Sequence, residues 1–101
     1  MNYQSITKLQ KIYGFDTMQS MINSGLAWKM EGNYGREAMA LLESGVCMLP
    51  KEFRVDYYGN RIPSRDVLKD GTKGTYKNSK RFWEGVENGS IDLYEDWART
   101  S

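Results

Sequence analysis

Apolar side chains recur at helical spacing through the first half of the chain, and glycines separate the apolar stretches. The first stretch places Ile6, Leu9 and Tyr13 on one face of a helix. Ser5 is a residue type that caps helix N-termini, and Gly14 is one that ends helices in a left-handed conformation. We therefore expect a short amphipathic helix between these two residues.

Two more helices are predicted in the same way. Asp16 is followed three residues later by Gln19, which is the spacing of a capping box, and the helix that it opens is expected to end at Gly25. Asn33 is the expected cap of a third helix, which ends at Gly45. The apolar side chains expected to face the core are Met18, Met21 and Ile22 in the second helix and Ala38, Leu41 and Leu42 in the third.

A different pattern follows Pro50. From Phe53 to Tyr57 apolar and polar side chains alternate, which is the period of a β-strand. The pair Gly59-Asn60 then predicts a two-residue turn of the II′ type. We expect one β-hairpin near residues 52–62, and because an isolated hairpin is only marginally stable in water, it must pack against the helices.

The remaining chain is expected to be helical again. Pro63 and residues 64–68 predict a short capped helix, and a loop follows over residues 69–75. A last helix is expected around Ser79 to Glu87, with Asn88-Gly89 as its stop. The final apolar side chains expected to contact the core are those of Ile91, Leu93 and Trp97.

This order of elements predicts a small α+β fold, mostly helical, in a single domain over residues 1–101 whose last few residues fray. Of the 101 residues 40% are hydrophobic and 27% are charged, which is a globular rather than a disordered composition. Cys47 is the only cysteine, and because it lies in an apolar run we expect a buried thiol rather than a reactive one. The sequence shows no signal peptide and no membrane-spanning run, so we expect a cytoplasmic protein.

Charge is distributed unevenly along the chain. Residues 1–60 carry six basic and six acidic side chains, whereas residues 61–81, here called the basic block, carry seven basic side chains against two acidic ones. Residues 82–101 then carry five acidic side chains and one basic one. This asymmetry indicates a surface that meets a charged partner, although the net charge of the chain is only +1.

The basic block and its aromatic neighbours form the first candidate binding surface. Cations neutralise phosphates and aromatic rings stack on bases, so this combination is typical of nucleic-acid binding. The low net charge favours the alternative, a solvated surface with local ion pairs. Cations recur at every fourth position, but Pro63, Gly71 and Gly74 argue against one continuous helical stripe. The candidate residues are Arg61, Arg65, Lys69, Lys73, Lys77, Lys80, Arg81, Tyr57, Tyr58 and Tyr76.

The acidic C-terminal segment is the second candidate surface. Carboxylates spaced along a surface can occupy a basic groove built for nucleic acid, and aromatic side chains beside them add binding energy. The candidate residues are Glu84, Glu87, Tyr94 and Trp97. The alternative is an ordinary amphipathic segment that packs on the domain.

The residue types needed for most catalysis are missing. The chain has no histidine, which is the commonest general base and metal ligand, and its single cysteine cannot form a zinc cluster. We therefore expect a protein without enzymatic activity, metal or cofactor. The alternative of an enzyme that relies on carboxylates alone requires a concave pocket in which they converge.

Four segments carry a resemblance: GREAM at 35–39, LLESGVCMLP at 41–50, DYYGNRIPSRD at 56–66 and GTKGTY at 71–76. Over roughly residues 25–83 the chain is similar to a group of small uncharacterised accessory proteins encoded by tailed bacteriophages. The resemblance implies no catalytic role, because that group has no assigned activity. It implies an accessory protein that acts in the cytoplasm of a host bacterium.

From the resemblance and the charge pattern we expect a protein that binds a host macromolecule and inhibits or redirects it by steric and electrostatic occlusion. An anti-CRISPR or other anti-defence factor is one form of this activity. The alternative is a nucleic-acid-binding regulator that uses the basic block. The expected partner is a host protein, with direct binding of nucleic acid as the second option and no membrane. The generous apolar inventory is also compatible with a homodimer.

Overall fold

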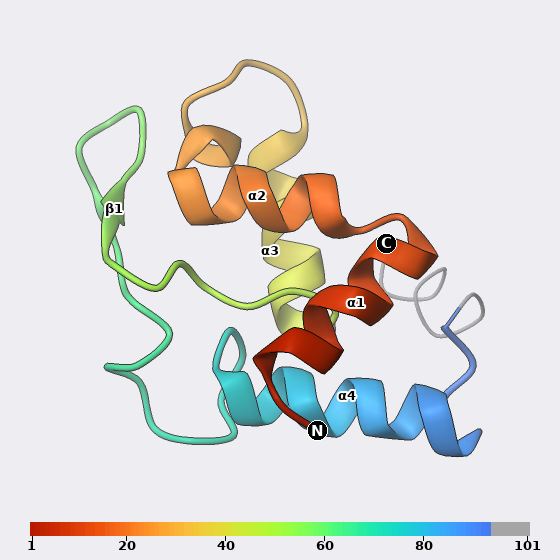
Figure 1. Ribbon diagram of the computed structural model, residues 1–101. Helices are drawn as coiled ribbons and strands as arrows, with labels where there is room; N and C mark the ends of the chain where they lie inside the picture. The colour runs from red at the N-terminus through yellow and green to blue at the C-terminus, as the bar shows by residue number, and fades with distance from the viewer. Residues whose placement is uncertain (94–101) are drawn as a thin grey trace.

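The computed structural model describes residues 1–93 and confirms an α+β fold. Figure 1 shows α4 along one end of the molecule, α1 lying against it, and α2 and α3 extending toward the opposite end, with the hairpin standing to one side. The elements in chain order are α1 (Tyr3–Tyr13), α2 (Asp16–Ser24), the 3-10 turn η1 (Leu26–Trp28), α3 (Tyr34–Ser44), β1 (Arg54–Val55), β2 (Arg61–Ile62) and α4 (Tyr76–Asn88). The expected contact of Trp97 and the fraying of the last residues lie outside the described part.

The glycine stops of the helices are confirmed, but the predicted N-terminal caps are mostly wrong. The N-cap of α1 is Asn2, whose Oδ1 accepts a hydrogen bond from the Ser5 backbone N–H at 2.9 Å. Asn2 has the extended backbone that a cap needs, so the helix starts before Ser5. Asn33 does occupy the N-cap position of α3, yet its side chain makes no capping hydrogen bond.

The capping box predicted for α2 does not form. The residue at the N-cap is Phe15, which offers no side-chain acceptor, and Gln19 is buried at 7% exposure instead of reaching back to the helix start. The helix nevertheless begins at Asp16, whose carboxylate is favourably placed in the first turn of a helix dipole. The polar side chain of Gln19 is used in the core, as described below.

The hairpin is real but its turn is longer than predicted. The strands pair antiparallel with Arg54 opposite Ile62 and Val55 opposite Arg61. The connection spans five residues from Asp56 to Asn60 rather than the two-residue turn expected. Asp56 causes the difference, because its Oδ1 accepts from two backbone N–H groups of the turn, at 2.9 and 2.8 Å.

Two further predictions on the C-terminal half need correction. Residues 64–68 form turns and not a helix, because the Ser64 hydroxyl accepts from the Asp66 N–H and itself donates to the Lys51 carbonyl. The last helix, α4, starts three residues before Ser79, with Thr75 as a side-chain cap. It ends at Gly89 as expected.

The centre of the fold is a buried segment, residues 46–50, that belongs to no helix or strand. Its backbone polar groups would be costly without partners, and side chains from distant helices supply them. The Val46 carbonyl accepts from Gln10 Nε2 at 2.8 Å and from Trp83 Nε1 at 3.0 Å. The amide of Gln19 pairs with Met48 in both directions, accepting its N–H at 2.8 Å and donating to its carbonyl at 2.9 Å.

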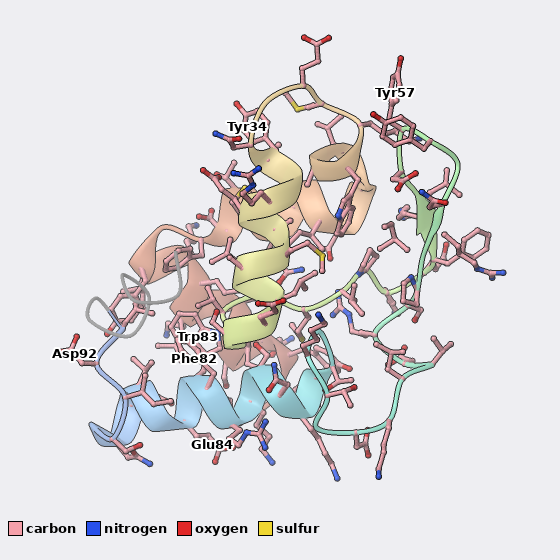
Figure 2. All side chains as sticks on the ribbon, turned by 180° about the vertical axis from the view of Figure 1, so that it is seen from behind. Tyr34, Tyr57, Phe82, Trp83, Glu84 and Asp92 are labelled. Carbon is pink, nitrogen blue, oxygen red and sulfur yellow. The ribbon has the colours of Figure 1, made fainter. Side chains whose placement is uncertain are left out.

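The apolar core surrounds this segment. Figure 2 shows Phe82 and Trp83 pointing from α4 toward the rest of the domain, whereas Glu84 points away from it. Cys47 is completely buried, which confirms the predicted buried thiol, and this burial raises the pKa of the thiol to about 12. The buried apolar residues are Ile6, Ile22, Ala27, Ala38, Leu41, Leu42, Val46, Cys47, Met48, Leu49, Phe82, Trp83 and Leu93.

Two helix-ending glycines make a matched test of how closely α3 and α4 pack. Both Gly14 and Gly45 have positive φ, at 85° and 99°, so alanine at either position costs about 1–2 kcal/mol of strain. A β-carbon at Gly45 would lie 2.7 Å from Phe82 Cβ, whereas one at Gly14 meets nothing within 4 Å. We expect Gly45→Ala to cost about 1–3 kcal/mol more than Gly14→Ala in urea unfolding. If both variants lost the same free energy of unfolding, the close contact between Gly45 and Phe82 of α4 would not contribute to the effect.

Candidate functional site

The hairpin carries exposed aromatic side chains at its tip and at its base. Tyr57 and Tyr58 at the tip are 75% and 84% exposed, and Phe53 at the base is 50% exposed. Arg61 places its guanidinium carbon 3.9 Å from the centre of the Phe53 ring, which is a cation–π contact. Met30, which is 42% exposed, lines one hollow with the two tyrosines, and we call the tip group and the Phe53–Arg61 pair together the hairpin-end surface.

The strand alternation explains which side chains lie on this surface. Arg54 points to the helices, because its Nε donates to the Asn23 carbonyl at the end of α2 at 2.9 Å. Its neighbours Phe53 and Val55 therefore lie on the opposite face, beside Arg61 of the partner strand. This face is exposed, so Phe53 and Val55 are presented to solvent.

The tip of the hairpin is held to the helical body by its backbone. The Tyr57 N–H donates to the Trp28 carbonyl at the end of η1, at 3.1 Å. The two tyrosine rings meet edge to face with centroids 5.4 Å apart. Residues 28–32 and both tyrosines line a hollow of about 410 Å³. Figure 2 shows Tyr57 and Tyr34 projecting at the same end of the molecule, away from α4.

The cations of the basic block do not gather on one surface. Lys77, Lys80 and Arg81 lie on α4 and line a shallow hollow of about 620 Å³, but Asp70 and Glu84 line it too. Lys77 forms an ion pair with Asp70 at 3.4 Å. Within the described residues, the spacing of four therefore brings together only the cations that share α4.

The other members of the block have separate environments. Arg61 is part of the hairpin-end surface, and Lys69 is exposed in a loop. Lys73 forms an ion pair with Glu43 of α3 at 3.3 Å. These local pairs, Lys73 with Glu43 and Lys77 with Asp70, agree with the solvated-surface alternative.

Arg65 differs from the rest of the block because its guanidinium bonds to the central segment and to α2. Its Nε donates to the Leu49 carbonyl at 2.7 Å and its Nη2 to Asn23 Oδ1 at 3.0 Å. Desolvation lowers the pKa of its guanidinium below the usual value, partly offset by interactions with Tyr3 and Asp66. It ties the segment after the hairpin to the central segment and to α2.

The remaining predicted site residues are placed as follows. Tyr76 is not available for stacking on a base, because its ring lies 4.3 Å from that of Tyr3 and its hydroxyl donates to the Met1 carbonyl. Glu84 and Glu87 are exposed on the outer side of α4. Tyr94 and Trp97 lie outside the described residues.

Sequence reasoning missed two residues of the hairpin-end surface, Phe53 and Met30. Phe53 was predicted to begin the alternating strand, but it lies one residue before the two-residue strand β1 and is exposed. Met30 lies in the irregular stretch between η1 and α3, where no periodicity indicates its environment. Only the packing of the hairpin beside η1 brings it to the tyrosines.

Residues 1–93 contain neither a cluster of metal-binding side chains nor a membrane-spanning helix. No group of three or more cysteine, aspartate or glutamate side chains is placed to hold a metal ion. None of the described helices has the length and apolar character needed to cross a membrane.

Comparison with known proteins places the chain in one family. Residues 1–62, more than half of the chain, match the family described as Domain of unknown function (DUF7417). The matched region covers α1, α2, η1, α3 and the whole hairpin, and it ends before α4. No curated protein and no solved structure matches the chain.

Proposed function

This chain is a member of the DUF7417 family, and we propose that it acts by binding a macromolecule of a bacterial host through its hairpin-end surface. The observation that carries the proposal is the exposure of Tyr57 and Tyr58 at a tip whose backbone is held in place. The hairpin lies within the region matched by the family.

The composition of the surface supports a protein partner. Tyrosine, phenylalanine, methionine and arginine are enriched at protein interfaces, and tyrosine and arginine dominate their hot spots. The hairpin-end surface combines all four residue types with a neighbouring hollow.

The geometry also supports binding at a low entropic cost. Asp56 accepts two backbone hydrogen bonds inside the turn, and the Tyr57 N–H is bonded to Trp28. A tip that is ordered before binding loses less conformational freedom when the partner arrives. Each tyrosine then needs only its two side-chain torsions to be restricted.

The biological role that we propose follows from the resemblance to phage accessory proteins. Covering a functional surface of a host protein would inhibit or redirect it, and a bacterial defence effector is the kind of target that this role implies. The protein would then act in the host cytoplasm and by occupancy alone, without turning over a substrate.

Nucleic-acid binding is the second candidate and has less support. The observation that favours it is the group of three cations on α4, Lys77, Lys80 and Arg81. The acidic side chains around them, and the use of Arg61, Lys73 and Arg65 elsewhere, reduce the positive surface available to phosphates.

A capture experiment with matched variants tests the proposal. Tagged protein is incubated with bacterial lysate, with and without nuclease, and bound proteins are quantified for the wild type, the double variant Tyr57→Ser/Tyr58→Ser, and the control Ile12→Ser. Ile12 is 65% exposed on α1, so its variant removes a comparable apolar side chain from another surface. We expect a specific protein to be retained by the wild type and the control and reduced roughly tenfold or more by the double variant.

Two results would contradict the proposal. One is a partner that the double variant retains as well as the wild type does. The other is retention that disappears after nuclease treatment and falls steeply with salt, which would favour nucleic-acid binding instead.

A further inference from the structure

A second hollow, separate from the hairpin-end surface, lies where α1 and α2 meet the end of the central segment. It has a volume of about 480 Å³, which is within the range of small-molecule sites. Seven of its eight lining residues have polar or charged side chains, although more of the lining surface is apolar than polar, and the residues that matter here are Tyr3, Asn23, Met48, Lys51, Arg65 and Asp66. The hollow is therefore suited to a ligand that combines a polar group with an apolar part.

Arg65 is held rigidly in the wall of this hollow. Three of its five N–H groups are used by protein atoms: Nε by the Leu49 carbonyl, Nη2 by Asn23 Oδ1 at 3.0 Å, and Nη1 by Met48 Sδ at 3.8 Å. The Tyr3 side chain also interacts with this guanidinium by a hydrogen bond, and its ring centre is 5.6 Å from the guanidinium carbon. A guanidinium fixed in this way is preorganised to bind an oxyanion through the N–H that remains and through its charge.

Arg65 has no carboxylate at ion-pair distance in the described part of the chain. The exposed cations Lys73 and Lys77 each have a carboxylate oxygen within 3.4 Å. The partly buried Arg65 forms no ion pair within 4.0 Å in the described part of the chain, and Asp66 acts on it only from a longer distance. Partly desolvated charges in proteins are normally paired, so a missing negative group is the feature that needs an explanation.

We propose that this hollow binds an oxyanion, the carboxylate or phosphate group of a small ligand, between Arg65 and Lys51. Arg65 supplies a directed hydrogen bond and Lys51, which is exposed at the same hollow, adds a second positive charge. With Asp66 as the only acid in the lining, the site has a net charge of one positive unit, which favours an anion. The Tyr3 ring provides a flat surface for the part of the ligand that follows the anionic group. The site does not depend on the proposed role of the hairpin.

Titration by NMR tests this site. Backbone amide shifts of the full chain are followed with sodium phosphate and, separately, with sodium acetate, against sodium chloride at equal ionic strength. We expect saturable shifts at Tyr3, Lys51 and Asp66 with at least one of the two oxyanions. The two arms identify which group the site prefers, and shifts that chloride reproduces in full would overturn the proposal.

Variants then locate the site. Lys51→Gln is expected to raise the dissociation constant about three- to tenfold, whereas Lys69→Gln, which removes an exposed lysine outside the hollow, is expected to leave it within about twofold. Arg65→Lys keeps the positive charge but loses the planar guanidinium. If this variant remains folded, we expect its amide shifts no longer to saturate with the oxyanion. Because Arg65 also supports the fold, Lys51→Gln decides the matter: an effect equal to that of Lys69→Gln would overturn the proposal.

Discussion

Replacing Gln19 by leucine is expected to lower the free energy of unfolding by about 2–5 kcal/mol. The side-chain amide of Gln19 is the partner of both the N–H and the carbonyl of Met48, and leucine offers neither donor nor acceptor. Each buried group left without a partner costs about 1–3 kcal/mol. Since a domain of this size has roughly 5–10 kcal/mol in total, the loss is a large part of its stability.

Urea unfolding followed by far-UV circular dichroism measures this effect. The matched control is Gln4→Leu, because Gln4 is an exposed helical glutamine in α1. We expect the control to stay within about 0.5 kcal/mol of the wild type. If both variants were equally stable, the pairing of Gln19 with the central segment would not contribute to the fold.

Replacing Trp83 by alanine is expected to cost about 3–5 kcal/mol. Trp83 has 0% exposure, its Nε1 donates to the Val46 carbonyl, and its ring contacts Tyr13 and Phe82 with centroids 5.7 and 5.1 Å away. Alanine leaves a large cavity between α4, α1 and the central segment. Guanidinium unfolding at fixed temperature provides the measurement.

Trp83→Phe separates the volume of the ring from its hydrogen bond. Phenylalanine keeps an aromatic ring in the site, and the Val46 carbonyl still accepts from Gln10 Nε2. We therefore expect a smaller loss, about 1–2 kcal/mol. A loss as large as that of Trp83→Ala would mean that the indole N–H, and not the packing, determines the contribution of this residue.

The accuracy of the sequence predictions followed the range of the interactions involved. The helix ends at Gly14, Gly25 and Gly45 were predicted correctly, because a left-handed glycine is recognised from a few neighbouring residues. The caps at Ser5 and in the Asp16–Gln19 box were wrong, although they are also local signals. In the second case the Gln19 side chain bonds to the buried backbone of Met48, which is distant in sequence, and not to the start of its own helix.

The predictions of candidate surface residues were also partly right and partly wrong. Tyr57 and Tyr58 were predicted from the sequence as exposed aromatic residues beside the basic block, and their exposure is confirmed. The spacing of four in the basic block did not become a surface, since only α4 is helical over that region. Arg65 received the same prediction as its neighbours, yet it alone of the block ties the central segment to α2.

By itself, then, the sequence determined the number and order of the helices that end in glycine, the presence of the hairpin and the burial of Cys47. These depend on backbone preferences and apolar runs that span a few residues. Only the tertiary structure decided that Gln10 and Gln19 enter the core. The physical reason is distance along the chain: the backbone groups that bond to Gln10 Nε2 and to Gln19 lie 36 and 29 residues away, on a segment with no regular structure of its own.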